Sequence, residues 1–152
     1  MDVGSSCGNI LERKIKKQEE TRIYVVVAGT IQVPVIANSS KPPLKTVVQP
    51  VGRQIAQACH AVSKLRYEKF CIDSGDIGMP FEPMTTIILQ ARDSAEMGHV
   101  YSLLFHKRLE PVFFYDNNPE YGPGDYQTAV AVFASPKQVR GILDYLPLWG
   151  SK

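Results

Sequence analysis

The chain has 152 residues, of which 44% are hydrophobic and 21% charged, and its net charge at pH 7 is +2. This length fits one compact domain, and so small a charge gives no sign of a whole-surface nucleic-acid binder. No window approaches the roughly 18 consecutive apolar residues of a membrane span, and residues 1–21 lack the apolar core of a secretory signal. Three cysteines without a CxxC pair favour reduced thiols over a zinc site. We therefore expect a soluble protein without a metal or other cofactor. A cytoplasmic location is favoured, with a mitochondrial one as the alternative.

The first half of the chain predicts a polar arm over residues 1–21 and a single domain over 22–152. Residues 22–28 are β-branched and almost continuously apolar, as a strand buried on both faces requires, and we expect this strand at the centre of a sheet. The proline-rich segment 29–51 predicts a long, partly ordered loop, in which residues 31–36 are a candidate edge strand. Such loops are often functional lids, but a tolerated insertion is an equal alternative.

A helix is predicted from residue 52 to about 70, with two distinct faces at 100° per residue. One face is apolar and is expected to pack inward; it comprises Ile55, Ala58, Cys59, Val62 and Leu65. The other presents a polar stripe made of Arg53, Gln57, His60 and Lys64. Since Cys59 falls on the apolar face, we interpret it as a small buried residue rather than a nucleophile.

The second half of the chain alternates strands with helices. After a loop at 74–83 come a strand at 85–91, a helix at 93–108, strands at 110–115 and 128–134 around a turn-rich loop, and a last helix beginning at Ser135. The inward residues are predicted to be Met97, Val100, Tyr101, Leu104 and Phe105 in the first of these helices and Val139, Ile142 and Leu143 in the second. Strands 110–115 and 128–134 lack a crossover helix, so the fold predicted is a three-layer α/β/α sandwich with a four-stranded mixed sheet.

Two stretches carry a resemblance to a known family. Residues 52–61, GRQIAQACHA, are similar to the Gly-Lys-x-x-x-Gln-x-x-His-Ala helix start of type II peptidyl-tRNA hydrolases, with Gly52, Gln57, His60 and Ala61 in register. Asp116, followed eleven residues later by Gln127-Thr128 and an apolar strand, resembles the same family's Asp-led loop and last strand. The order of elements agrees from about residue 23 to 146.

The resemblance implies hydrolysis of the ester bond of peptidyl-tRNA, releasing peptide and free tRNA. It implies that the reaction needs no metal, that the partner is RNA rather than DNA or a membrane, and that a homodimer is one expectation. The candidate catalytic residues are His60, Asp116, Arg53 and Gln57, and the candidate substrate-binding residues are Lys64, Glu120, Gln127 and Thr128. Histidine exchanges protons near neutral pH, which suits a general base, and Asp116 is expected to orient its imidazole or the attacking water.

The chain departs from the family pattern at three places. After the first strand it has Ala28-Gly29-Thr30 and the proline-rich segment instead of the family's Arg-x-Asp-Leu. Arg53 stands where the family has a lysine, and Pro119-Glu120 stands where its loop carries Arg-Thr, so that a carboxylate replaces an active-site threonine. A second hypothesis is therefore a catalytically degenerate member of the fold that binds tRNA or a protein. Tyr121, Tyr126 and Trp149 are candidates for stacking on unpaired bases, with local packing as the alternative for each.

Overall fold

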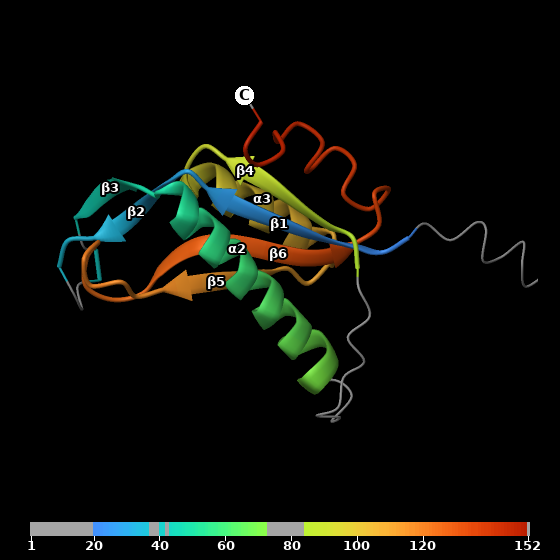
Figure 1. Cartoon of the computed structure of the whole chain (residues 1–152), viewed down its shortest axis with the longest axis horizontal. Coiled ribbons are helices and arrows are strands. Elements are labelled where there is room, and N and C mark those ends of the chain that lie inside the picture. The colour runs from blue at the N-terminus through green and yellow to red at the C-terminus, as the bar shows by residue number, and fades with distance from the viewer. Residues whose placement is uncertain (1–19, 37–39, 42, 73–83, 152) are drawn as a thin grey trace, which may run out of the picture.

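The computed structural model describes residues 20–36, 40–41, 43–72 and 84–151 (Figure 1). Almost all of the predicted polar arm, and all of the predicted loop at 74–83, lie outside these residues. Within the described part of the chain, no helix has the length and apolar character needed to cross a membrane.

A four-stranded mixed sheet forms the centre of the molecule, in the order β4-β1-β6-β5 (Figure 1). Its strands are β1 (Arg22–Ala28), β4 (Thr86–Ala91), β5 (Val112–Asp116) and β6 (Tyr126–Ala134). β1 is parallel to β4 and antiparallel to β6, which is in turn antiparallel to β5. The predictions of a mixed sheet and of a central first strand are confirmed. The position of β1 follows from its apolar run, which needs cover on both faces of the sheet.

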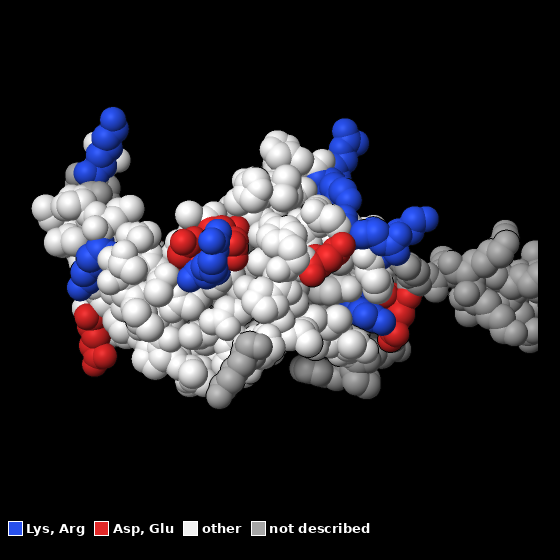
Figure 2. All heavy atoms as spheres, turned by 90° about the horizontal axis from the view of Figure 1, so that it is seen from above, with Lys and Arg blue, Asp and Glu red and all other residues white. Residues whose placement is uncertain are grey.

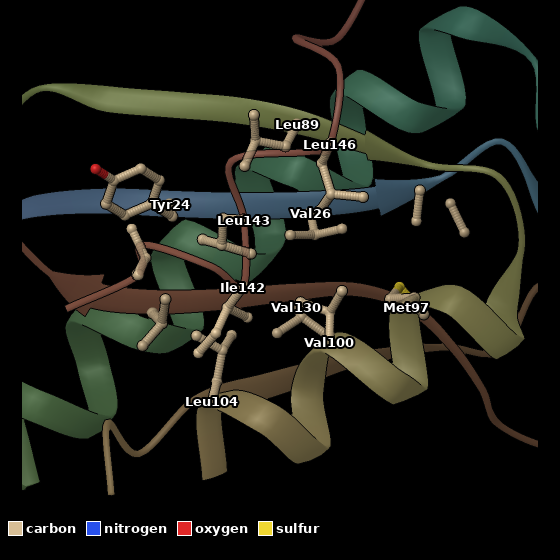
Figure 3. Close-up of a cluster of buried hydrophobic side chains, with 14 of the residues drawn as sticks. Tyr24, Val26, Leu89, Met97, Val100, Leu104, Val130, Ile142, Leu143 and Leu146 are labelled. Carbon is tan, nitrogen blue, oxygen red and sulfur yellow. The ribbon is translucent and has the colours of Figure 1, made fainter. Parts of the chain in front are cut away.

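Two helices pack on opposite faces of this sheet. α2 (Val51–Arg66), continued by a short π-helical segment (Tyr67–Ile72), packs on the face that carries Ile23, Val25 and Val27. α3 (Ser94–His106) packs on the other face and buries Met97, Val100 and Leu104 (Figure 3). Asp93 caps α3 by accepting a hydrogen bond from the Glu96 N–H. The chain is therefore a mixed α/β protein.

One residue predicted in the α3 core lies outside it. Phe105 is 58% exposed, and its ring stacks at 6.2 Å on that of Tyr101 instead of entering the cluster around Leu104. Phe105 follows Leu104 by one residue, so its side chain points about 100° away from the direction in which Leu104 enters the core.

The segment 29–51, predicted as a loop, instead contains two antiparallel strands, which we call the hairpin. β2 (Thr30–Pro34) pairs with β3 (Leu44–Val48) in a separate two-stranded sheet, not at the edge of the main one. Alternation places Ile31, Val33 and Val47 on the face that packs against the core. The prolines weighed against strands, but Pro34 ends β2, and Pro43 and Pro50 flank β3, positions where no central ladder is broken.

The predicted last helix is wrong, although its inward residues are right. Residues 136–145 form successive turns with mostly i to i−3 hydrogen bonds, and Gly141 has a φ of +80°, a left-handed conformation that interrupts a helix. Ser135 and Gln138 exchange hydrogen bonds as in a capping box, which explains the start signal in the sequence. Val139, Ile142 and Leu143 are buried in the same cluster as residues of β1 and α3. Figure 3 shows Ile142 and Leu143 in this cluster.

Candidate functional site

The buried face of α2 is rotated relative to the predicted one. Gln57, from the predicted polar stripe, is only 2% exposed, whereas Ile55 is 45% exposed and Cys59 is also exposed. The small residues Ala58 and Ala61 form the contact with the sheet, and Gln57 lies beside them because polar partners from β5 and β6 meet its amide. The interpretation of Cys59 as a buried residue is therefore wrong.

Gln57 links the helix to both predicted loop and strand residues. Its Nε2 donates to Asp116 Oδ2 at 2.8 Å, and its Oε1 accepts from Thr128 Oγ1 at 3.0 Å. Thr128 is fully buried, and its hydroxyl also lies 3.4 Å from the Phe114 carbonyl oxygen. Since both polar atoms of the Gln57 amide are engaged within the protein, Gln57 acts here by holding Asp116 in place.

A bulge in β6 makes this contact possible. Phe114 pairs with Ala129 and Tyr115 with Gln127, so that Thr128 stands between them without a partner residue on β5. Such an extra residue bends its strand and re-aims a side chain, here the Thr128 hydroxyl toward Gln57. The Gln-Thr pair of the sequence motif is thus divided, with Thr128 directed to α2 and Gln127 donating to the Tyr115 hydroxyl at 3.2 Å.

The Thr128 hydroxyl makes a testable contribution to stability. Thr128→Val keeps the side-chain shape but leaves Gln57 Oε1 buried without a donor, which is expected to lower the free energy of unfolding by about 1–3 kcal/mol. Thr46→Val on the exposed face of β3 is the matched control and should stay within about 0.5 kcal/mol of the parent. Urea denaturation of both variants measures the difference, and equal values for the two would contradict this role.

Arg53 completes the surroundings of Asp116. Its Nη2 lies 3.4 Å from Asp116 Oδ2, and its guanidinium lies over the Tyr121 ring at 5.3 Å. The two side chains of the ion pair are partly exposed, at 34% for Arg53 and 20% for Asp116, so solvent screens the attraction between them. Arg53 Nε is buried without a hydrogen-bond partner, so the guanidinium retains a donor that faces no acceptor in the described residues.

The loop after Asp116 is fixed by a buried tyrosine. The Tyr126 hydroxyl accepts from the Asn118 N–H at 2.9 Å and donates to the Asn118 carbonyl oxygen at 3.3 Å. Burial, reinforced by the nearby Asp116 carboxylate, raises the pKa of Tyr126 above its ordinary value. The phenol therefore stays neutral and can both donate and accept, while the Asn117 N–H donates to Asp116 Oδ1 at 2.8 Å.

The hairpin supports the same loop from its other side. A Cβ atom on Gly122 would lie 2.5 Å from Val33 Cγ1 and 2.6 Å from the Pro34 carbonyl oxygen, both in β2. Only glycine fits at this contact without displacement. Strand β2, from the segment predicted as a loop, is therefore in tight contact with the loop that follows Asp116.

His60 and Lys64 lie further along α2. His60 is exposed, with its ring 5.0 Å from that of Phe114, and it forms no hydrogen bond with Asp116 in the described residues. Lys64 Nζ donates to the Phe113 carbonyl oxygen at 2.6 Å, lies 3.8 Å from Glu68 and sits 5.5 Å from the centre of the Tyr115 ring. The structure thus brings Arg53, Gln57, Asp116 and Thr128 together, with an exposed His60 and a partly buried Lys64 further along α2.

Glu120 is not part of this cluster. Its side chain is exposed, its backbone N–H donates to Asn118 Oδ1 at 3.2 Å, and its carboxylate has no ion pair within the described chain.

The three aromatic candidates for base stacking pack locally. Tyr121 lies under Arg53, Tyr126 is buried, and Trp149 Nε1 donates to Gln54 Oε1 at 2.9 Å.

Some residues that shape the site carried no clear sequence signal. The sequence marks Tyr126 only as an aromatic residue. Its hydrogen bonds to the Asn118 backbone depend on a loop that brings the two residues, eight positions apart, into contact. Gly122 belongs to the turn-rich run 116–125, and only its approach to β2 distinguishes it from Gly124, which has open space around it. Tyr115, beside Lys64, was not singled out at all.

Charge is not concentrated on the face shown in Figure 2. Among the residues drawn there in colour, basic and acidic side chains occur in small groups of both signs, without a broad basic patch.

No protein-family model matches the chain. No curated protein matches it either.

Proposed function

We propose that the chain hydrolyses the ester bond of peptidyl-tRNA, as a divergent cytoplasmic member of the type II peptidyl-tRNA hydrolases with their three-layer α/β/α sandwich. One observation carries the proposal. Asp116, from the loop motif, is hydrogen-bonded by Gln57 and paired with Arg53, both from the helix motif, 59 and 63 residues away in the chain. Two separate parts of the resemblance therefore meet at one carboxylate, with His60 one helical turn further along α2.

In the proposed reaction, water attacks the carbonyl carbon of the ester on the terminal ribose. His60, which is exposed, accepts the proton of the water and returns it to the ribose oxygen as the C–O bond breaks, yielding a peptide acid and a free tRNA hydroxyl. Asp116 orients water or substrate and is itself held by Gln57. Arg53, whose side chain is partly exposed, and Lys64 meet the anionic oxygen or phosphate.

The test is release of a labelled N-blocked aminoacyl group from tRNA by the purified protein. His60→Ala is expected to lower kcat by about 100-fold or more, since general-base catalysis contributes that much or more. His99→Ala, on the exposed side of α3, is the matched control and should leave kcat unchanged. Equal activity in the parent and His60→Ala would remove His60 from the mechanism.

A second candidate is a binding module of the same fold without catalysis. It is favoured by the pairing of Asp116 with Arg53, which occupies the carboxylate, and by the absence of a hydrogen bond between Asp116 and His60 in the described residues. If the parent binds tRNA but does not hydrolyse it, Arg53→Lys combined with Glu120→Thr tests this reading. Hydrolysis by that double variant would identify these two family departures as the cause of the loss.

A further inference from the structure

A row of aromatic side chains runs from Tyr115 and Phe113 in β5 to Tyr101 and Phe105 in α3. Neighbouring ring centres lie 6.1 Å apart for Tyr115 and Phe113, 4.1 Å for Phe113 and Tyr101, and 6.2 Å for Tyr101 and Phe105. The ends of the row are the most open, with Tyr115 47% and Phe105 58% exposed. Within the described residues, no strand pairs with the free side of β5.

The ring of Tyr115 is held in a fixed orientation. Gln127 Nε2 donates to its hydroxyl, and the Lys64 ammonium lies over the ring, itself anchored on the Phe113 carbonyl oxygen. An exposed aromatic ring on a rigid strand loses little conformational freedom when a flat ligand stacks on it. His60 lies 5.0 Å from the Phe114 ring, which packs with α2, whereas Phe113, the neighbour of Tyr115 in the row, packs with α3. The row and His60 therefore lie on opposite faces of β5, the edge strand of the sheet.

The other end of the row opens onto two adjoining hollows. One, of about 350 Å³, is lined by Lys69, Tyr101, Phe105 and neighbouring residues, and the other, of about 570 Å³, by Phe105, His106, Arg108 and Glu110. Lys69 is paired with Glu110, and this contact lowers the pKa of the Glu110 carboxyl. Arg108 is exposed and forms no ion pair within the described chain, so its guanidinium can meet an anion.

We propose that this row, from Tyr115 to Phe105, binds the unpaired nucleotides at the end of an RNA chain, with bases on the rings and phosphates near Lys64 and Arg108. The inference rests on the proposed function and assigns a surface to the unpaired end of the proposed substrate. Aromatic rings interleaved with cations are the usual surface for single-stranded nucleic acid, because every base has a face that can stack. Glu68 and Glu110 offset Lys64 and Lys69, so stacking rather than charge carries most of the affinity.

The test is direct binding of two fluorescent tetraribonucleotides, tetraadenylate and an abasic chain with the same phosphates, followed by anisotropy. Tyr115→Leu and Phe105→Leu are each expected to weaken tetraadenylate binding about tenfold, and Tyr115→Phe, which keeps the ring, to bind like the parent. Tyr145→Leu is the matched control, since Tyr145 is 55% exposed but belongs to the C-terminal turns. The abasic chain should bind the parent about as weakly as tetraadenylate binds the Leu variants.

Equal binding of both oligonucleotides, or equal losses in Tyr115→Leu and Tyr145→Leu, would overturn the inference. The readout does not depend on hydrolysis. Binding that is lost in the Leu variants supports the row even if the parent releases no peptide. Conversely, a parent that hydrolyses peptidyl-tRNA with the same KM as both Leu variants leaves the proposed function standing and removes the row.

Discussion

Asp116→Ala is expected to lower kcat/KM for the proposed hydrolysis of peptidyl-tRNA by about 100-fold or more. The carboxylate is the shared acceptor for Gln57 Nε2 and Arg53 Nη2, so its removal leaves a buried amide and a half-buried guanidinium without their partner. Both side chains are then free to leave the positions from which they define the site. Steady-state release of labelled N-blocked aminoacyl groups measures the loss.

Asp116→Asn separates charge from shape at the same position. It keeps the size of the side chain but cannot pair with Arg53 as an anion, so we expect a loss close to that of Asp116→Ala. Asp125→Ala, at an exposed position in the same loop, is the control and should retain parental kcat/KM. Full activity in Asp116→Asn would mean that the carboxylate charge has no part in the reaction.

Gly122→Ala is expected to lower the free energy of unfolding by about 1–3 kcal/mol, the usual cost of overpacking. The added methyl group meets Val33 Cγ1 and the Pro34 carbonyl oxygen at distances that real Cβ atoms do not show, and the backbone of β2 cannot give way as a flexible side chain would. The same displacement moves the loop that carries Asp116, so we also expect activity to fall.

Gly98→Ala is the matched control for this substitution. Gly98 lies inside α3 with nothing within 4 Å of the added atom, so the alanine should stabilise the protein by about 0.5–1 kcal/mol through helix propensity. Urea denaturation of both variants gives the comparison. A Gly122→Ala variant as stable as the parent would show that the hairpin and the Asp116 loop are not in tight contact.

The main sheet could be predicted because its strands have a local sequence signal, a run of apolar residues. The apolar runs 22–28 and 128–134 indicated strands by composition, the first of them a central one, and the structure buries both almost throughout. The hairpin could not be predicted in the same way. β2 and β3 are short, contain or adjoin prolines, and are stabilised by pairing with each other and by packing of Ile31 and Val33 on the core, which are tertiary effects.

The candidate site was predicted in its residues more than in its contacts. The helix motif and the Asp-led loop supplied Arg53, Gln57, Asp116 and Thr128, and the structure brings these four together. The helical periodicity alone places Gln57 on the exposed side. It contains no information about the bulge at Thr128, which presents a hydroxyl to the Gln57 amide. The same periodicity predicts Ile55 and Cys59 as core residues, whereas Ala58 and Ala61 make the contact with the sheet.

The most direct test of the proposed function is the hydrolysis of N-blocked aminoacyl-tRNA by the purified parent protein, with His60→Ala and Asp116→Ala assayed beside it at several salt concentrations. The proposal predicts catalytic turnover by the parent and its loss, by about 100-fold or more, in both variants. No turnover by a parent that still binds tRNA would contradict it, and would make the chain a binding module that has kept the fold without the reaction.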